Sequence, residues 1–194
     1  LDKVRSDKKE ILYNLVQFAL YDGSRYIENE LKENGKFEYK WFNNYFTDKN
    51  REAYFIKKGK TYLGFIMINE NLKFNNNGKS IAEFLIMPQY RRKHIGKKVA
   101  IEVFEKYKGY WEVEPIKNSN EAYSFWKKTI EEYTSGNYIV KNSGATEIFV
   151  LEMPEEFKEL QKAYIKANVV DIEVLTDHAI HATLTKISKK EKKC

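Results

Sequence analysis

The sequence predicts one α+β domain, in residues 1–153, followed by a smaller extension in residues 154–194. Helical and β-type hydrophobic patterns alternate along the first part, and two β-rich runs meet at the turn residues Lys58 and Gly59. A nearly continuous apolar run then leads straight into a basic loop and a helix. With 194 residues and 42% hydrophobic content, the chain is long enough to bury a full core.

The N-terminal part begins with a predicted helix over residues 6–24. Apolar residues recur at helical spacing between Ile11 and Ala19, Ser6 or Asp7 would cap the start, and Gly23 would end the helix.

A second, shorter helix is expected over residues 24–37, because Asn34 and Gly35 form a typical helix end. The aromatic stretch that follows has no clear periodicity. Residues 53–70 are then predicted to form a β-hairpin.

The remaining elements follow from the same patterns. They are a strand over residues 81–88, a helix over 95–108, a strand over 110–116, a helix over 120–133 and a strand pair over 137–153.

The junction between the apolar strand and its helix is strongly basic. Its sequence, "QYRRKHIGKKVA", carries Arg91, Arg92, Lys93, Lys97 and Lys98. The unpaired N–H groups and the dipole at a helix start favour an anion, especially a phosphate, and Gly96 would allow its close approach. The alternative is a basic helix start that is simply solvated.

The stretch "MPQYRRKHIGKKVA" resembles the acetyl-CoA binding motif of the GNAT family of N-acetyltransferases. That motif reads Arg or Gln, two residues, Gly, one residue, then Gly or Ala. Arg91 and Gly96 match its ends, and His94 stands at the position of its first glycine.

Further segments over residues 11–153 are similar, in the same order, to one bacterial branch of the family: "YDGSRY", "GKFEYKWF", "LGFIMI", "EFLIMP", "WEVEPIKNSNEAYSFW" and "KKTIEEYT". The resemblance implies a GNAT fold, with a central mixed, mostly antiparallel sheet flanked by helices. The extension would add a helix and a β-hairpin.

The resemblance also implies acetyl-CoA as co-substrate and names the residues that would hold it. Backbone groups of Leu85, Ile86 and Met87 would pair with the pantetheine arm, where the strand splays from its parallel neighbour. The other expected cofactor-binding residues are Arg91, Arg92, Lys93, His94, Ile95, Gly96, Lys97, Ser119, Asn120, Phe125 and Trp126. At His94 the backbone is expected to keep a conformation that a residue with a branched side chain can adopt.

The candidate catalytic residues are Glu83 and Tyr123. Strand alternation places Glu83 on the face of Ile81, Leu85 and Met87, where it could accept the proton of an acceptor amine; the alternative is a carboxylate that pairs with a lysine.

The proton donor to the leaving thiolate is harder to assign from the sequence. In the family it is often a tyrosine, but Trp126 occupies that position here. Tyr123 is the candidate, with Tyr133 or water as alternatives.

The predicted function is transfer of the acetyl group to a primary amine by direct attack in a ternary complex. The acceptor would be a small-molecule or peptide amine. One alternative is an amine carried on RNA, such as aminoacyl-tRNA, which the net charge of +6 permits although nucleic acid is not the expected partner. Another is a GNAT-fold module that binds coenzyme A without turnover. The aromatic residues of "WFNNYF" would either wall the acceptor site or belong to the core.

The remaining features predict a cytoplasmic protein without a membrane anchor. No run approaches about 18 apolar residues, no signal pattern is present, and Cys194 is the single cysteine. No metal site is expected, because His178 and His181 would point to opposite faces of a strand. The extension should pack on the domain or on a second subunit, as in a homodimer.

Overall fold

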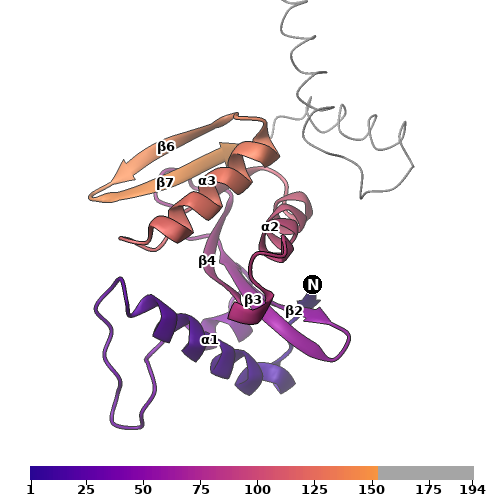
Figure 1. Ribbon diagram of the computed structural model, residues 1–194, viewed down its shortest axis with the longest axis vertical. Helices are drawn as coiled ribbons and strands as arrows, with labels where there is room; N and C mark the ends of the chain where they lie inside the picture. The colour runs from indigo at the N-terminus through magenta and orange to yellow at the C-terminus, as the bar shows by residue number, and fades with distance from the viewer. Residues whose placement is uncertain (153–194) are drawn as a thin grey trace, which may run out of the picture.

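The computed structural model describes residues 1–152, which form one seven-stranded sheet with helices on both faces (Figure 1). The strand order is β1-β2-β3-β4-β5-β7-β6. Neighbouring strands are antiparallel except β4 and β5, which are parallel. The strands are β1 (Asp2–Lys3), β2 (Arg51–Lys58), β3 (Thr61–Asn69), β4 (Lys79–Ile86), β5 (Tyr110–Val113), β6 (Tyr138–Ser143) and β7 (Thr146–Glu152).

Three α-helices and three short 3-10 turns complete the described part. They are η1 (Ser6–Lys8), α1 (Lys9–Gly23), η2 (Asn43–Phe46), η3 (Pro88–Tyr90), α2 (Ile95–Lys106) and α3 (Asn120–Thr134). The predicted fold class, a mixed sheet flanked by helices, is confirmed.

Two hydrophobic cores lie on opposite faces of the sheet. Leu12 and Val16 of α1 pack with Phe65 of β3 on one face. Val103 of α2 and Ile130 of α3 pack on the other. Figure 1 shows α1 on one side of the sheet and α2 and α3 on the other. Successive residues of one strand therefore point alternately into the α1 core and into the core formed with α2 and α3.

The predicted hairpin is confirmed, with Lys58 paired to Thr61 around a tight turn in which Gly59 has a φ of +59°. The later helices and strands also lie within a few residues of their predicted bounds.

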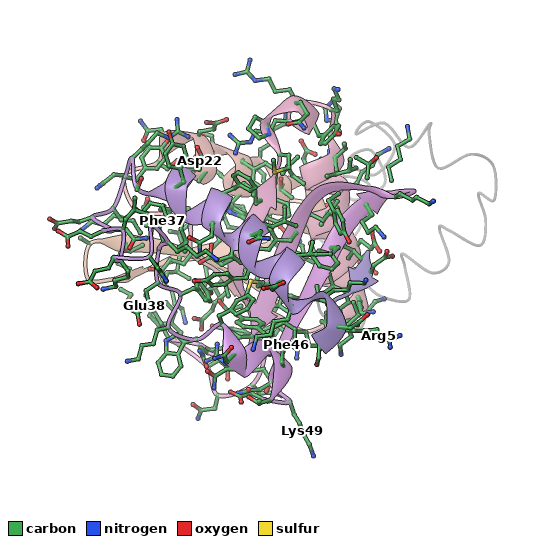
Figure 2. All side chains as sticks on the ribbon, turned by 90° about the horizontal axis from the view of Figure 1, so that it is seen from below. Arg5, Asp22, Phe37, Glu38, Phe46 and Lys49 are labelled. Atoms are coloured by element: carbon green, nitrogen blue, oxygen red, sulfur yellow. The ribbon has the colours of Figure 1, made fainter. Side chains whose placement is uncertain are left out.

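The second predicted helix is wrong. Residues 24–37 form turns and an isolated bridge between Leu31 and Phe37. The segment has no apolar face to bury, since Ile27 and Leu31 stay exposed, so a helix there would gain no packing. Instead, Gln17 of α1 holds the end of this segment against the helix. Its side chain accepts the N–H of Phe37 (2.8 Å) and donates to the Phe37 carbonyl (3.1 Å). Figure 2 shows Phe37 beside α1.

The predicted cap of the first helix is also wrong. Ser6 and Asp7 lie in η1, and Lys8 precedes α1 without a side-chain cap. The short 3-10 turn supplies the entry to the helix in place of a capping side chain.

β4 and β5 are paired only at their beginning, where Lys79 faces Trp111 and Ser80 faces Glu112. Beyond this point β4 and β5 are no longer paired, as the expected splay requires. The N–H of Met87 donates to the carbonyl of Leu63 in β3 (2.8 Å). Because backbone groups alternate in direction along a strand, those of Phe84 and Ile86 face the splay.

A register shift interrupts β4 at Ala82. Met67 of β3 pairs with Glu83, but the next residue, Ile68, pairs with Ile81. Such a bulge exchanges the faces of the residues on its two sides. Ile81 therefore packs with the α2 and α3 core, whereas Leu85 packs with the α1 core. The prediction that Ile81 and Glu83 share a face is wrong for this reason.

The loop between β3 and β4 is held by a buried carboxylate. Glu112 of β5 is 3% exposed and accepts the N–H groups of Lys73 (2.7 Å) and Phe74 (2.9 Å). Paired in this way, the charge of Glu112 fixes the loop against the sheet.

Within residues 1–152, no helix is long and apolar enough to cross a membrane. The predicted helix and hairpin of residues 154–194 lie outside the described residues, and so do His178, His181 and Cys194.

Candidate active site

The start of α2 presents a row of free backbone donors. Among residues 1–152, no acceptor binds the N–H groups of His94, Ile95, Gly96 and Lys97. These groups lie at the positive end of a 12-residue helix. The arrangement suits a phosphate or diphosphate.

The loop before α2 contains two residues in the left-handed conformation. Arg92 has a φ of +58° and His94 a φ of +57°. His94 thus keeps a backbone conformation that a residue other than glycine can adopt, although glycine adopts it most easily. Histidine is among the residues that tolerate it, at a cost of about 1 kcal/mol.

The basic side chains of the loop have different surroundings. Lys97 forms an ion pair with Glu132 of α3, and the Lys93 ammonium lies 5.8 Å from the ring centre of Tyr90. Arg92 and Lys98 are exposed. The loop thus keeps exposed positive charge at its surface, while its backbone supplies fixed donors.

Arg91 binds two other parts of the domain. Its Nε donates to the carbonyl of Ile86 (2.9 Å), and its Nη2 lies 2.8 Å from the carboxylate of Asp22, at the end of α1. Both donors are therefore used within the protein.

The three strand residues predicted to bind the pantetheine arm differ in what they offer. Both backbone groups of Met87 are engaged, since its carbonyl also accepts the N–H of Tyr90 (2.8 Å). Leu85 points its backbone groups toward β3 by alternation, and Ile86 faces the splay. Phe84 and Ile86 are thus the residues of β4 with backbone groups directed at the gap.

Aromatic residues connect β4 to α3 beside the splay. The rings of Phe84 and Phe125 are stacked at 5.7 Å, and Trp126 lies 5.3 Å from Phe84. Gly96 packs against this group, because an added Cβ would stand 3.2 Å from the Phe125 ring and 3.5 Å from Ile86. The start of α2, the end of β4 and Phe125 therefore form one continuous wall.

Ser119 acts as the N-cap of α3. Its buried hydroxyl accepts the N–H of Ala122 (3.2 Å), so this oxygen is already used in the protein. Asn120 is exposed on the first turn of the helix.

Glu83 lies on the α1 face, partly buried, in a polar group that also contains Tyr39, Tyr45, Arg51 and Asn69. Burial raises the pKa of Glu83 to about 7, and the nearby Tyr39 hydroxyl opposes part of the shift. A carboxyl with a pKa near neutrality can accept a proton at physiological pH.

Tyr123 is not next to Glu83. Its ring lies 5.1 Å from Phe149 of β7, on the α3 side of the sheet. It also lines a cavity of about 340 Å³ at the start of α3. Burial, with a smaller contribution from Glu147, raises the pKa of Tyr123. Tyr133 is buried and donates to Glu105 (2.9 Å), so it belongs to the core.

Several residues of this site were missed by the sequence reasoning. Tyr39 approaches Glu83 from the segment before η2, and Arg51 acts on Tyr39 in turn; nothing distinguishes Tyr39 among 14 tyrosines. In "WFNNYF", Phe42 and Tyr45 are core residues and Trp41 is exposed.

The family model described as "Acetyltransferase (GNAT) family" matches residues 12–130, which include β4, the basic loop, α2 and most of α3. The chain belongs to the GNAT family. It is an acetyltransferase that uses acetyl-CoA. No curated protein matches its sequence.

Solved structures of acetyltransferases share the fold at low sequence identity. The PaiA N-acetyltransferase from Thermoplasma acidophilum, in complex with coenzyme A, is 15% identical with a TM-score of 0.56, over 78% of this chain and 96% of its own. An acetyltransferase from Thermus thermophilus is 13% identical with a TM-score of 0.55, over 77% and 93%. An aminoglycoside 6'-N-acetyltransferase complexed with coenzyme A is 10% identical with a TM-score of 0.51, over 78% and 95%. The narrower resemblance to a bacterial branch stays a prediction.

The geometry of this chain fits acetyl-CoA. Four free N–H groups at the start of α2 match a diphosphate, and a Cβ at Gly96 would be in tight contact with the Phe125 ring rather than directed at these groups. At the splay, the backbone groups of Phe84 and the N–H of Ile86 are directed at the gap for the amides of a pantetheine arm, whereas the Ile86 carbonyl accepts from Arg91.

Proposed function

We propose that the protein transfers the acetyl group of acetyl-CoA to a primary amine by direct attack in a ternary complex, with Glu83 as the general base. The observation that carries this proposal is the partly buried Glu83 beside the bulge of β4, whose pKa is raised to about 7. Acetyl-CoA supplies the acetyl group as a thioester. The amine nitrogen bonds to the acetyl carbon, the carbon–sulfur bond breaks, and the thiolate leaves.

The proton of the amine goes to Glu83. An ammonium has no lone pair, so attack requires a base at neutral pH. With a pKa raised to about 7, Glu83 is partly ionised at neutral pH and remains basic enough to hold the proton. Tyr39 lies beside Glu83 on the α1 side of the sheet, and Tyr45 lies beside Tyr39.

Negative charge also develops on the thioester carbonyl oxygen and on the leaving thiolate, and the chain offers a backbone N–H for the first and a tyrosine for the second. An N–H of Phe84 or Ile86, directed at the splay, would stabilise the oxygen of the thioester carbonyl, and one such donor contributes about 3 kcal/mol. Tyr123 would give its proton to the thiolate, directly or through water; its raised pKa makes it a weaker acid than an ordinary tyrosine.

The acceptor is a small-molecule or peptide amine in this proposal. The exposed basic residues Arg92, Lys93 and Lys98 gather at the start of α2, away from the face that carries Glu83. Their position favours the diphosphate of acetyl-CoA over an RNA acceptor.

The test measures thiol release from acetyl-CoA with a panel of primary amines, for wild type and Glu83→Gln, between pH 5.5 and 9. The acceptor ammonium also loses its proton as pH rises, so the ratio of the two proteins at each pH reports Glu83. We expect a ratio of about 100 or more above pH 7, falling below pH 7. Equal activity of the two proteins, or no amine that accelerates thiol release, would contradict the proposal.

A further inference from the structure

The end of α1 touches both sides of the gap between β4 and β5. On the β4 side, Asp22 binds Arg91, which also binds the carbonyl of Ile86. On the β5 side, Ile116 lies 3.1 Å from a Cβ added to Gly23.

A second contact on the β5 side joins the same segments. The Asn118 side chain donates to the carbonyl of Tyr26 (3.3 Å). We call residues 22–26 the α1 bridge, and Figure 2 shows Asp22 at the end of α1 nearest to Phe37.

The bridge spans the gap where the sheet itself does not. β4 and β5 share only two paired positions, at their beginning, so backbone pairing does not set their separation further along. The contacts of the α1 bridge with the β4 side and the β5 side can therefore fix the distance between the two strands beyond their paired positions.

We propose that Arg91 and Asp22 are positioning residues that set the width of the splay for the pantetheine arm, rather than ligands of the diphosphate. The Arg91 guanidinium already has two protein partners, and its charge is balanced by Asp22. Asp22 is also held by Arg25. The diphosphate still has the free N–H groups of His94 to Lys97.

The proposal separates the two halves of coenzyme A. The nucleotide half meets the start of α2, on one side of the gap, and does not need the bridge. The pantetheine half passes between the two sides and depends on their separation. Loss of the bridge should therefore weaken binding of the whole molecule and leave binding of the nucleotide half unchanged.

The experiment titrates coenzyme A and its nucleotide fragment, 3'-phospho-ADP, by calorimetry at one salt concentration. The variants are Asp22→Asn, Arg91→Gln and the double variant. We expect each to raise the Kd of coenzyme A about 3- to 10-fold, the range for a partly exposed, hydrogen-bonded ion pair. The double variant should resemble each single variant, because both changes break the same contact. The Kd of the fragment should stay within about twofold.

Two control variants each remove one charge close to the bridge, a positive charge to match Arg91→Gln and a negative charge to match Asp22→Asn. Arg92→Gln changes an exposed arginine of the loop and should weaken both ligands by a similar small factor. Glu28→Gln changes an exposed carboxylate beyond the bridge and should alter neither. Thermal melting of every variant checks that the domain is folded.

Other outcomes would overturn the proposal. If Arg91→Gln weakens both ligands alike while Asp22→Asn weakens neither, Arg91 is a diphosphate ligand. If coenzyme A binds all variants as tightly as wild type, the bridge does not set the gap.

Discussion

The raised pKa of Glu83 predicts an unusual pH dependence of stability. The pKa of Glu83 is about 7 in the folded protein, whereas its ordinary value, taken for the unfolded chain, is 4.5. This difference is equivalent to about 3 kcal/mol. Between these two pH values the folded state binds more protons than the unfolded state. The free energy of unfolding should therefore fall as pH rises from about 4.5 to about 7, and Glu83 should destabilise the protein above that range.

The substitution Glu83→Gln removes the ionisation while keeping the shape of the side chain. At pH 5, where Glu83 is already protonated, wild type and variant should have similar stability. At pH 8.5 the variant should be more stable, by up to about 3 kcal/mol and somewhat less because Glu83 keeps some solvent contact. The measurement is urea unfolding of both proteins from pH 5 to 9.

Glu52 provides a control of opposite sign. Burial alone would raise its pKa, but hydrogen bonds from Lys3 and Tyr54 outweigh burial and lower it. Glu52→Gln should therefore destabilise the protein at pH 7, and the difference should disappear as pH falls below about 4.

The result that would refute the reasoning is a Glu83→Gln variant that is no more stable than wild type at pH 8.5. Such a result would mean that the surroundings of Glu83 stabilise its ionised form, so that its pKa is not raised in the folded protein. Greater stability of the variant combined with lost acetyl transfer would match a base held at a cost to folding.

Three further predictions concern the backbone around the site. His94→Gly should stabilise the protein by about 0.5–1 kcal/mol and preserve coenzyme A binding, since glycine adopts the left-handed conformation freely; melting and calorimetry check this, and weaker binding would assign a role to the imidazole. Gly64→Ala should cost at least about 2 kcal/mol, because the new Cβ would stand 1.9 Å from the carbonyl oxygen of Leu85; unfolding of this variant by urea tests the contact, and a neutral effect would mean that β4 shifts easily. Glu112→Ala should cost about 2–3 kcal/mol and speed amide hydrogen exchange in the β3–β4 loop, because two N–H groups lose their acceptor; unchanged exchange would show that other contacts hold the loop.

Sequence reasoning succeeded where local patterns decide the structure. The hairpin at Gly59, the apolar strand ending at Pro88 and the helix that follows the basic loop were all predicted from short-range spacing. It failed for residues 24–37, where a favourable helix end was present but no apolar face that the core could bury. The motif from Arg91 to Gly96 was readable, whereas the backbone conformation of His94 was not.

The sequence alone determined the order of the elements, the basic start of α2 and the family, because each depends on residues close together in the chain. Only the tertiary structure decided the environment of Glu83, since the bulge at Ala82 arises from pairing with β3 and places the carboxylate on the α1 face. It also decided the partner of Arg91, because Asp22 lies 69 residues away in the chain. Spacing within one segment predicts which side chains share a face, but the partner of a charge and the pKa of a buried acid depend on elements that meet only after folding.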